Sequence, residues 1–264
     1  MTAVTASRPA SPVGDLLRQW RERRRISQLD LSIQADISTR HLSFVETGRA
    51  QPSRDMVLHL ADNLDVPLRE RNHLLLAAGY APVYGETSLD APQMAAIRQA
   101  IRLVLKAHEP FPATVIDRAW NLVDANSTIS LLTAGVAPEL LEPPVNVLRL
   151  SLHPRGVAPN IINLGEWRAH LLARLRREIA VTGDPDLVEL LDELRRYPCD
   201  QPEVEVPGPG DVVVPMRVRT SVGDLSFFGT IATFGTPVDV TVAELSIESF
   251  FPADPETAQA LRSL

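Results

Sequence analysis

The stretch ISQLDLSIQADISTRHLSFVETG, residues 26–48, decides how the first part of this chain folds. Leu31 and Ala35 stand four residues apart, and Leu42 and Val45 stand three apart. At these spacings, each pair shares one face of a short helix. The pattern therefore predicts two short helices, each with a small apolar face.

A tight turn separates the two predicted helices. Asp36 tolerates the left-handed backbone that such a turn needs, and Ser38 is a natural N-cap for the helix that follows. This layout predicts a helix-turn-helix, in which two helices cross steeply over a shared apolar contact. Spacing alone also admits a generic helical hairpin.

The second of these helices presents polar side chains opposite its buried pair. A helix of this kind docks its N-terminal half in the major groove of DNA, where Arg40 can donate a bidentate fork to a guanine. Phe44 either covers a thymine methyl group or packs under the following loop. The residues predicted to face DNA here are Ser38, Thr39, Arg40, Ser43, Phe44 and Thr47.

A family resemblance rests on Ser27-Gln28, Leu31-Ser32, the Asp36-Ile37-Ser38 turn, Glu46-Thr47-Gly48-Arg49 and Pro52-Ser53. These residues resemble the xenobiotic-response-element (Cro/phage-repressor-like) helix-turn-helix family. In that family the Gln that opens the second helix and residues near the start of the third contact DNA. The resemblance implies that role for Gln28, Thr39 and Arg40. The family usually has Gly where this chain has Asp36, so we expect slight strain in the turn.

Arginines around this stretch are candidates for phosphate contacts. Val13–Arg25 predicts a first helix with its arginines, Arg21 among them, on the exposed side. Each of these arginines either lies against phosphate or simply faces solvent. Arg49 and Arg54 flank the next loop and are predicted to hold the DNA backbone without reading its sequence.

The charge of the chain is unevenly distributed. Its net charge of −7 argues at first against a nucleic-acid partner. Between Arg8 and Arg54, however, nine arginines stand against five acidic residues, a net of +4, whereas Tyr80 to the end carries a net of −9. The local field governs phosphate binding, so the first part remains the predicted DNA-binding part.

Length and composition bound the remaining possibilities. The 264 residues, 45% of them hydrophobic, suffice for two domains. The single cysteine, Cys199, excludes a disulfide framework and a Cys-rich zinc site. No apolar run approaches the ~20 residues that cross a bilayer, and the N-terminus lacks a signal-peptide core. We therefore expect a cytoplasmic, nucleoid-associated protein without a membrane partner.

The second half of the chain predicts a different architecture. Helical patterns cover 91–106, 127–133, 144–150, 164–182 and 186–196, and strand patterns cover 114–117, 122–124, 212–220, 225–234 and 238–251. This order predicts an α+β domain with a five-stranded antiparallel sheet, similar to a PAS domain with a pocket between helices and sheet. The expected organisation is a disordered N-terminus (1–12), an all-α helix-turn-helix bundle of five helices (13–79), a linker (80–90), the PAS-like domain (91–254) and a tail (255–264).

Three long segments carry a more specific resemblance: Glu70–Tyr84, Pro144–Leu175 and Leu225–Asp254. Together with the helix-turn-helix they look like the MmyB-like transcription regulators. The resemblance implies a bacterial regulator whose second domain binds a small apolar, fatty-acid-like ligand.

Residues for the expected pocket are chosen by chemistry. Bulky apolar side chains suit its lining, and cationic side chains suit a carboxylate. The candidates are Trp120, Trp167, Phe227, Phe228, Phe234 and Phe250 for the lining, and Arg149, His153 and Arg155 for the polar anchor. Each aromatic is alternatively plain core, and His153 alternatively bonds a loop carbonyl.

Catalytic chemistry finds little support in the sequence. It has no glycine-rich phosphate loop, no nucleophile elbow and no His pair at metal spacing. Glu166 and His170 could share a metal but are more simply a surface pair. We therefore expect no enzyme, no metal and no cofactor. The leading hypothesis is a homodimeric, sequence-specific regulator of double-stranded DNA controlled by a small ligand. The alternative is a DNA-binding repressor or antitoxin controlled by a protein partner, with the second domain serving dimerisation.

Overall fold

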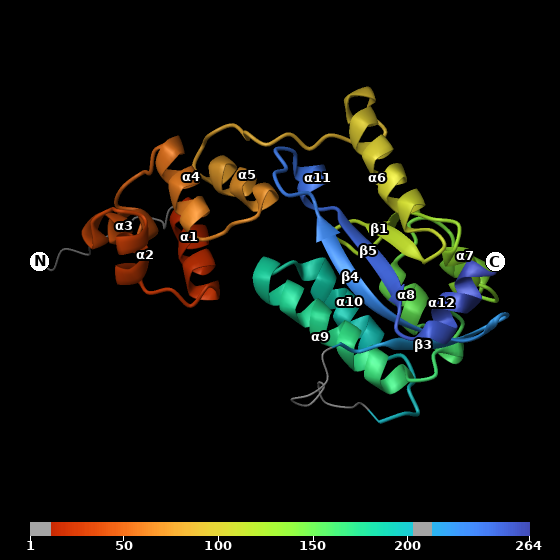
Figure 1. The fold of residues 1–264 in the computed structure, drawn as a ribbon. Coiled ribbons are helices and arrows are strands. Elements are labelled where there is room, and N and C mark those ends of the chain that lie inside the picture. The colour runs from red at the N-terminus through yellow and green to blue at the C-terminus, as the bar shows by residue number, and fades with distance from the viewer. Residues whose placement is uncertain (1–11, 203–212) are drawn as a thin grey trace, which may run out of the picture. The chain divides into compact units, whose positions relative to one another are not determined.

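The computed structural model describes residues 12–202 and 213–264, and these divide into two compact units. The first unit runs to Glu86 and includes Val238–Val240, and the second comprises Thr87–Pro237 and Thr241–Leu264. Figure 1 shows a helical N-terminal unit and a second unit built on a sheet. Except for Pro12, which begins the first helix, the predicted disordered N-terminus lies outside the described residues.

The first unit is a bundle of five helices, as predicted. They are α1 (Pro12–Arg23), α2 (Gln28–Gln34), α3 (Thr39–Glu46), α4 (Arg54–Asn63) and α5 (Leu68–Ala77). Serine N-caps open α2, α3 and α4, each accepting a backbone N–H three residues on. The faces predicted from spacing are buried: Leu42 and Val45 are fully enclosed in the core.

Two backbone positions make the close crossing of these helices possible. Asp36 takes a positive φ of 48° in the turn between α2 and α3, the conformation expected of it. Gly14 lets α1 approach the end of α3, because a Cβ there would lie 2.4 Å from the Val45 carbonyl oxygen. An alanine at Gly14 would force the two helices apart.

The second unit is built on a five-stranded antiparallel sheet with strand order β2-β1-β5-β4-β3. The strands are β1 (Ala113–Ile116), β2 (Leu122–Ala125), β3 (Met216–Thr220), β4 (Gly223–Thr233) and β5 (Ser246–Pro252). The helices are α6 (Ala95–His108), α7 (Ile129–Leu132), α8 (Val147–Leu152), α9 (Leu164–Thr182), α10 (Pro185–Arg195), α11 (Val240–Ala243) and α12 (Pro255–Arg262). Two early strands, a helical middle and three late strands confirm the predicted α+β class.

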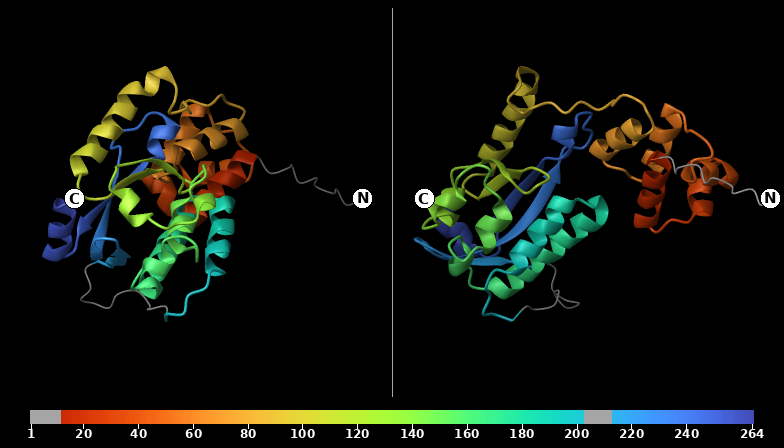
Figure 2. Two further views of the ribbon diagram at one scale, coloured as in Figure 1. Left: turned by 90° about the vertical axis from the view of Figure 1, so that its right-hand side faces the viewer. Right: turned by 180° about the vertical axis from the view of Figure 1, so that it is seen from behind.

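Helices cover both faces of this sheet (Figures 1 and 2). On one face, α6 packs Ile101 and Leu105 against Val115 and Ile247. On the other face, α7 to α10 enclose a larger core that includes Phe227 of β4. Side chains alternate between the two faces along each strand, so neighbours in sequence enter different cores.

Two segments differ from their predicted structure. The strand predicted over 238–251 begins only at Ser246, and Val240–Ala243 is the short helix α11. The Val240 amide donates to the Gly85 carbonyl at 2.7 Å, a contact that overrides the strand preference of a Val-rich run. The predicted tail, 255–264, contains α12, which is capped by Asp254 and anchored by the fully buried Leu261.

None of the helices described is long and apolar enough to span a bilayer.

Candidate functional site

The exposed surface of α3 collects most of the residues predicted to face DNA. Ser38, Thr39 and Arg40 are exposed at its N-terminal end, and Thr47 is exposed at its C-terminal end. Ser43 and Phe44 lie between them and are half-buried. Arg49 and Arg54 are exposed beyond the helix. The arrangement gives α3 a polar outer face with cationic groups at both ends.

Arg40 and Arg49 both contact the ring of Phe44. The guanidinium carbon of Arg40 lies 5.3 Å from the centre of the Phe44 ring, and that of Arg49 lies 5.7 Å from it. The Phe44 carbonyl also accepts the backbone N–H groups of Arg49 and Ala50, which fixes the following loop. Cation–π contacts of this kind are worth about 0.5–1 kcal/mol at exposed sites. Phe44 therefore positions both arginines on one surface.

Besides the N-cap Ser38, three of the predicted DNA-facing residues make side-chain hydrogen bonds within the unit. The hydroxyls of Thr39 and Ser32 lie 2.8 Å apart and join α3 to α2. The Gln28 amide donates to a Glu46 carboxylate oxygen at 2.7 Å, and the Thr47 hydroxyl donates to the Ser43 carbonyl at 2.6 Å. These bonds hold the side chains in fixed orientations on the surface of the unit.

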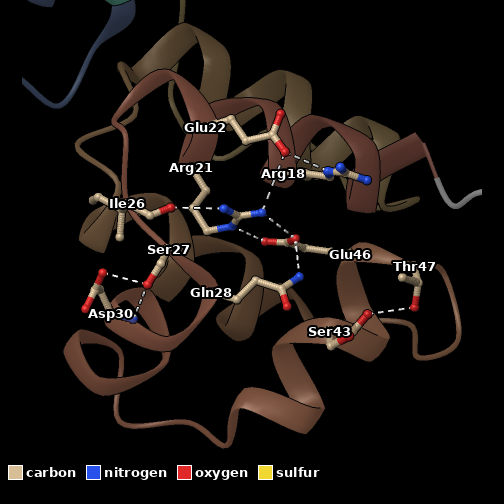
Figure 3. Close-up of polar contacts among 10 residues, drawn as sticks. All are labelled: Arg18, Arg21, Glu22, Ile26, Ser27, Gln28, Asp30, Ser43, Glu46 and Thr47. Carbon is tan, nitrogen blue, oxygen red and sulfur yellow. Dashed lines mark hydrogen bonds and ion pairs between the residues drawn. The ribbon is translucent and has the colours of Figure 1, made fainter.

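A buried ion pair beneath this surface was not predicted (Figure 3). Arg21 donates to both Glu46 carboxylate oxygens, at 2.7 and 2.9 Å, and to the Ile26 carbonyl at 2.9 Å. The prediction that Arg21 is exposed is wrong, since only 8% of this residue is exposed. The sequence did hold a signal for the burial of Arg21. It stands four residues after Leu17, so both side chains share one face of the helix, and Leu17 is buried. The pair ties α1 to the end of α3.

The second unit holds a mainly apolar cavity of about 90 Å³ between its helices and the sheet. Three of the predicted lining residues, Trp120, Trp167 and Phe250, do line it. The other lining residues are Thr114, Leu122, Ile129, Leu132, Thr133, Val147, Leu148, Leu150, Ser151, Val157, Leu171, Met216 and Glu248. Helices α7, α8 and α9 thus supply most of an aliphatic wall.

The remaining predicted aromatics lie outside this lining. Phe227 is fully buried in the core and meets Phe250 edge-on, with ring centres 6.5 Å apart. Phe228 stacks on Phe251 at 5.5 Å, and Phe234 packs with the cluster on the α6 face. Phe227 thus fits the alternative of plain core, whereas Phe228 and Phe234 are half-buried.

The three predicted carboxylate anchors also lie outside the lining and have other partners. Arg149 forms a two-pronged pair with Glu193 at 2.8–3.0 Å, which lowers the pKa of the Glu193 carboxyl. His153 Nδ1 accepts the Arg155 backbone N–H at 3.0 Å, so its structural bond is to an amide and not to the carbonyl considered above. The Arg155 guanidinium pairs with Glu139.

Polar groups of the cavity wall were missed by reasoning on the sequence. Thr114 and Glu248 face each other across β1 and β5, so both side chains point to the same side of the sheet. Ser151 of α8 accepts the Trp167 indole N–H at 3.1 Å. Strand register, which sets which residues meet across a sheet, was the information missing from the sequence.

Glu166 and His170, which the sequence suggested could share a metal ion, contact different neighbours. A Glu166 carboxylate oxygen accepts the Asn163 amide at 2.7 Å, whereas His170 stacks on Trp167 with ring centres 5.3 Å apart. In the part of the chain that the structure describes, no three His, Cys, Asp or Glu side chains are grouped so as to hold a metal ion.

Two family models match separate parts of the chain. Residues 12–74 match the family described as a helix-turn-helix domain. A solved structure described as an RNA-binding Light-Oxygen-Voltage receptor is similar at 14% identity and a TM-score of 0.31, over 96% of this chain. This chain spans 63% of that structure's length. No curated protein matches the chain.

The family of the chain follows from the match of its second unit. Residues 97–264, well over half of the chain, match the family described as the MmyB-like transcription regulator ligand binding domain. The matched ligand-binding family is a domain of transcription regulators. With its helix-turn-helix domain and its ligand-binding domain, this chain belongs to the MmyB-like transcription regulators.

Proposed function

We propose that this regulator binds specific double-stranded DNA through α3 and senses a small, largely apolar ligand in the cavity of its second unit. The observation that carries the proposal is the apolar cavity itself, because it lies in the unit that matches a ligand-binding family.

The shape of the first unit supports DNA binding by α3. Arg40 at the exposed N-terminal end is suited to a guanine edge, since major-groove readers place base contacts in the first turns of the helix. Arg49, held by the same Phe44 ring, is suited to a neighbouring phosphate. Gln28 has one amide hydrogen engaged by Glu46 and a second that can reach a phosphate.

The lining of the cavity supports an aliphatic ligand body. Leucine, isoleucine and valine side chains surround most of the space, as a fatty-acid-like chain requires. A volume of about 90 Å³ is small beside the ~300–1,000 Å³ of drug-sized pockets. A longer ligand therefore needs side chains to move, and the unbranched Met216 is the lining residue best able to do so.

We propose further that the regulator acts as a homodimer on paired half-sites. A lone helix-turn-helix reads few base pairs, and dimers reach specificity by spacing two half-sites about 34–36 Å apart, one helical turn. Selection of bound fragments from random-sequence DNA tests this directly. We expect an enriched motif with two-fold symmetry. Recovery of unenriched DNA would contradict sequence-specific binding, and an asymmetric single motif would contradict the homodimer.

A further inference from the structure

The second half of strand β4 has an unpaired edge. β3 pairs only with Gly223–Phe227, whereas β5 pairs along β4 as far as Thr233. In the part of the chain that the structure describes, no strand pairs with Gly229–Thr233 on the side away from β5. All of these residues are exposed, and Ile231 is 51% exposed. β4 is therefore an interior strand over its first half and an edge strand over its second half (Figure 1).

The hairpin between β3 and β4 fixes which backbone groups face this edge. Thr220 and Gly223 flank a turn of two residues, so each donates a backbone hydrogen bond to the other. Such bonded pairs recur at every second residue of an antiparallel ladder. The N–H and C=O groups of the odd-numbered residues of β4 therefore point toward β3. Beyond the end of β3, the same direction leaves the groups of Gly229, Ile231 and Thr233 at the free edge.

The outer edges of β2 and β3 are protected in ways that this edge is not. β3 carries the exposed Arg217, whose carbonyl accepts the Ile162 amide at 2.7 Å. β2 carries Asp124, and its Leu122 amide donates to the Val145 carbonyl at 2.7 Å. Charged side chains and covering segments are the usual means by which proteins keep a sheet edge from pairing.

The composition of the free edge favours pairing. No charged residue stands between Asp224 and Asp239, and the segment 229–233 reads GTIAT. Threonine and isoleucine favour strands, and the segment has no proline to block a ladder. An exposed, neutral strand without proline presents its backbone groups to a further strand.

We propose that two copies of this chain pair their β4 strands antiparallel along this edge, so that one continuous sheet crosses the homodimer. This inference rests on the homodimer proposed above and names its surface. An antiparallel strand can pair with its own copy about a two-fold axis. The register that matches all the free groups places Ile231 opposite the partner's Ile231 and Gly229 opposite the partner's Thr233. Because the segment is neutral, no like charges meet across the axis.

A proline at the centre of the edge tests the pairing. Ile231→Pro removes an N–H that points away from β5, so the ladder with β5 keeps its hydrogen bonds. Thr230 is in a strand, the conformation that a following proline requires. Analytical ultracentrifugation of the full-length protein measures the dissociation constant of the dimer. We expect the unaltered protein to dimerise and Ile231→Pro to raise that constant at least about tenfold, with circular dichroism unchanged.

The matched control keeps the backbone donor. Ile231→Thr retains the N–H and a β-branched side chain, so the dissociation constant should change less than about threefold. A loss of the dimer as large as that of Ile231→Pro would show that the side chain and not the strand edge holds the two copies together, and it would overturn the inference.

A cysteine at the same position tests the register. In a chain with Cys199→Ser, Ile231→Cys places thiols on residues whose Cα atoms would lie about 5.5 Å apart, within the range of a disulfide. We expect a covalent dimer on mild oxidation. Val123→Cys in the same background is the control, because Val123 is exposed on β2 at the opposite edge of the sheet. It should remain without a cross-link.

The outcomes separate this inference from the homodimer on which it rests. A protein that is monomeric at every concentration measured would overturn both. A dimer that survives Ile231→Pro unweakened and gives no cross-link through Ile231→Cys would overturn the pairing of β4 and leave the homodimer standing. If Ile231→Pro does not fold, the cross-link decides alone, and its absence in a dimeric protein overturns the inference.

Discussion

We expect Arg40 to be the residue on which the recognition of a DNA sequence by α3 most depends. Its side chain is exposed at the start of the helix and lies over the Phe44 ring, so we expect it to enter the major groove in a fixed orientation. We predict that Arg40→Ala costs about 1–3 kcal/mol at the selected DNA site and little on random DNA. Arg102→Ala, which removes an exposed arginine from α6 in the second unit, is the control for lost charge. Equal losses on both DNAs would make Arg40 a phosphate contact.

Arg49 shares the Phe44 ring with Arg40 but has a different predicted role. It lies beyond the end of α3, where we expect a guanidinium to contact the DNA backbone and not the bases. Arg49→Ala should weaken binding to all sequences and reduce the salt slope of the binding constant by about one. The measurement is affinity against salt concentration on selected and random DNA. An unaltered slope removes Arg49 from the interface.

We expect His170 to make the stability of the second unit sensitive to acid. Burial, followed by the charges of Arg174 and Arg177, lowers the pKa of His170 below its usual 6.5. Below about pH 6.5, His170 therefore binds a proton more readily in the unfolded chain than in the folded one. The free energy of unfolding is unaffected by this difference above about pH 6.5 and decreases as the pH falls below it. We predict that His170→Gln flattens the fall in unfolding free energy between about pH 7.5 and pH 5.5.

At the scale of elements, the Arg21–Glu46 pair joins α1 to α3. Only 1% of the Glu46 side chain is exposed, so its removal leaves the buried Arg21 guanidinium with only the exposed Glu22 carboxylate, 3.9 Å away, as a counter-charge. Glu46→Gln should destabilise the first unit by about 3–5 kcal/mol in urea unfolding. The double change Arg21→Met with Glu46→Leu should recover most of that loss, because it removes both buried charges.

The exposed pair Arg18–Glu22 on α1 provides the comparison. Arg18→Gln should leave the unfolding midpoint nearly unchanged, since water screens the charges of Arg18 and Glu22. If Glu46→Gln were as mild as Arg18→Gln, the buried pair would have no structural role.

How far the elements could be predicted depends on whether local patterns fix them. The predicted helix over 164–182 has the same bounds as α9, because its apolar spacing and its terminal Gly183 act locally. The strand predicted over 238–251 was correct only from Ser246 onward. The hydrogen bond from the Val240 amide to the Gly85 carbonyl accompanies the short helix that replaces its first part. The sequence identified Trp120, Trp167 and Phe250 as lining residues by size. It could not identify Thr114 and Glu248, because strand register brings them together.

At the scale of the whole molecule, the first unit should retain its fold when separated. Its apolar core is drawn from residues between Val13 and Tyr80. The segment after α5 also belongs to it, since Asn72 accepts the Val83 and Tyr84 backbone N–H groups at 3.1 and 3.2 Å. A fragment ending at Glu86 should therefore keep its DNA sequence preference, bind more weakly through lost dimerisation, and melt cooperatively. A fragment that does not fold would contradict the independence of the two units.

The most direct test of ligand control is the affinity of full-length protein and of this fragment for selected DNA during a titration with aliphatic compounds. A ligand changes DNA affinity only if it binds two states of the protein differently, and such couplings are typically about 5- to 150-fold. We predict a change of that size in the full-length protein and none in the fragment. Compounds that raise the melting temperature of the full-length protein while leaving its DNA affinity unchanged, or that alter the fragment equally, would contradict the account.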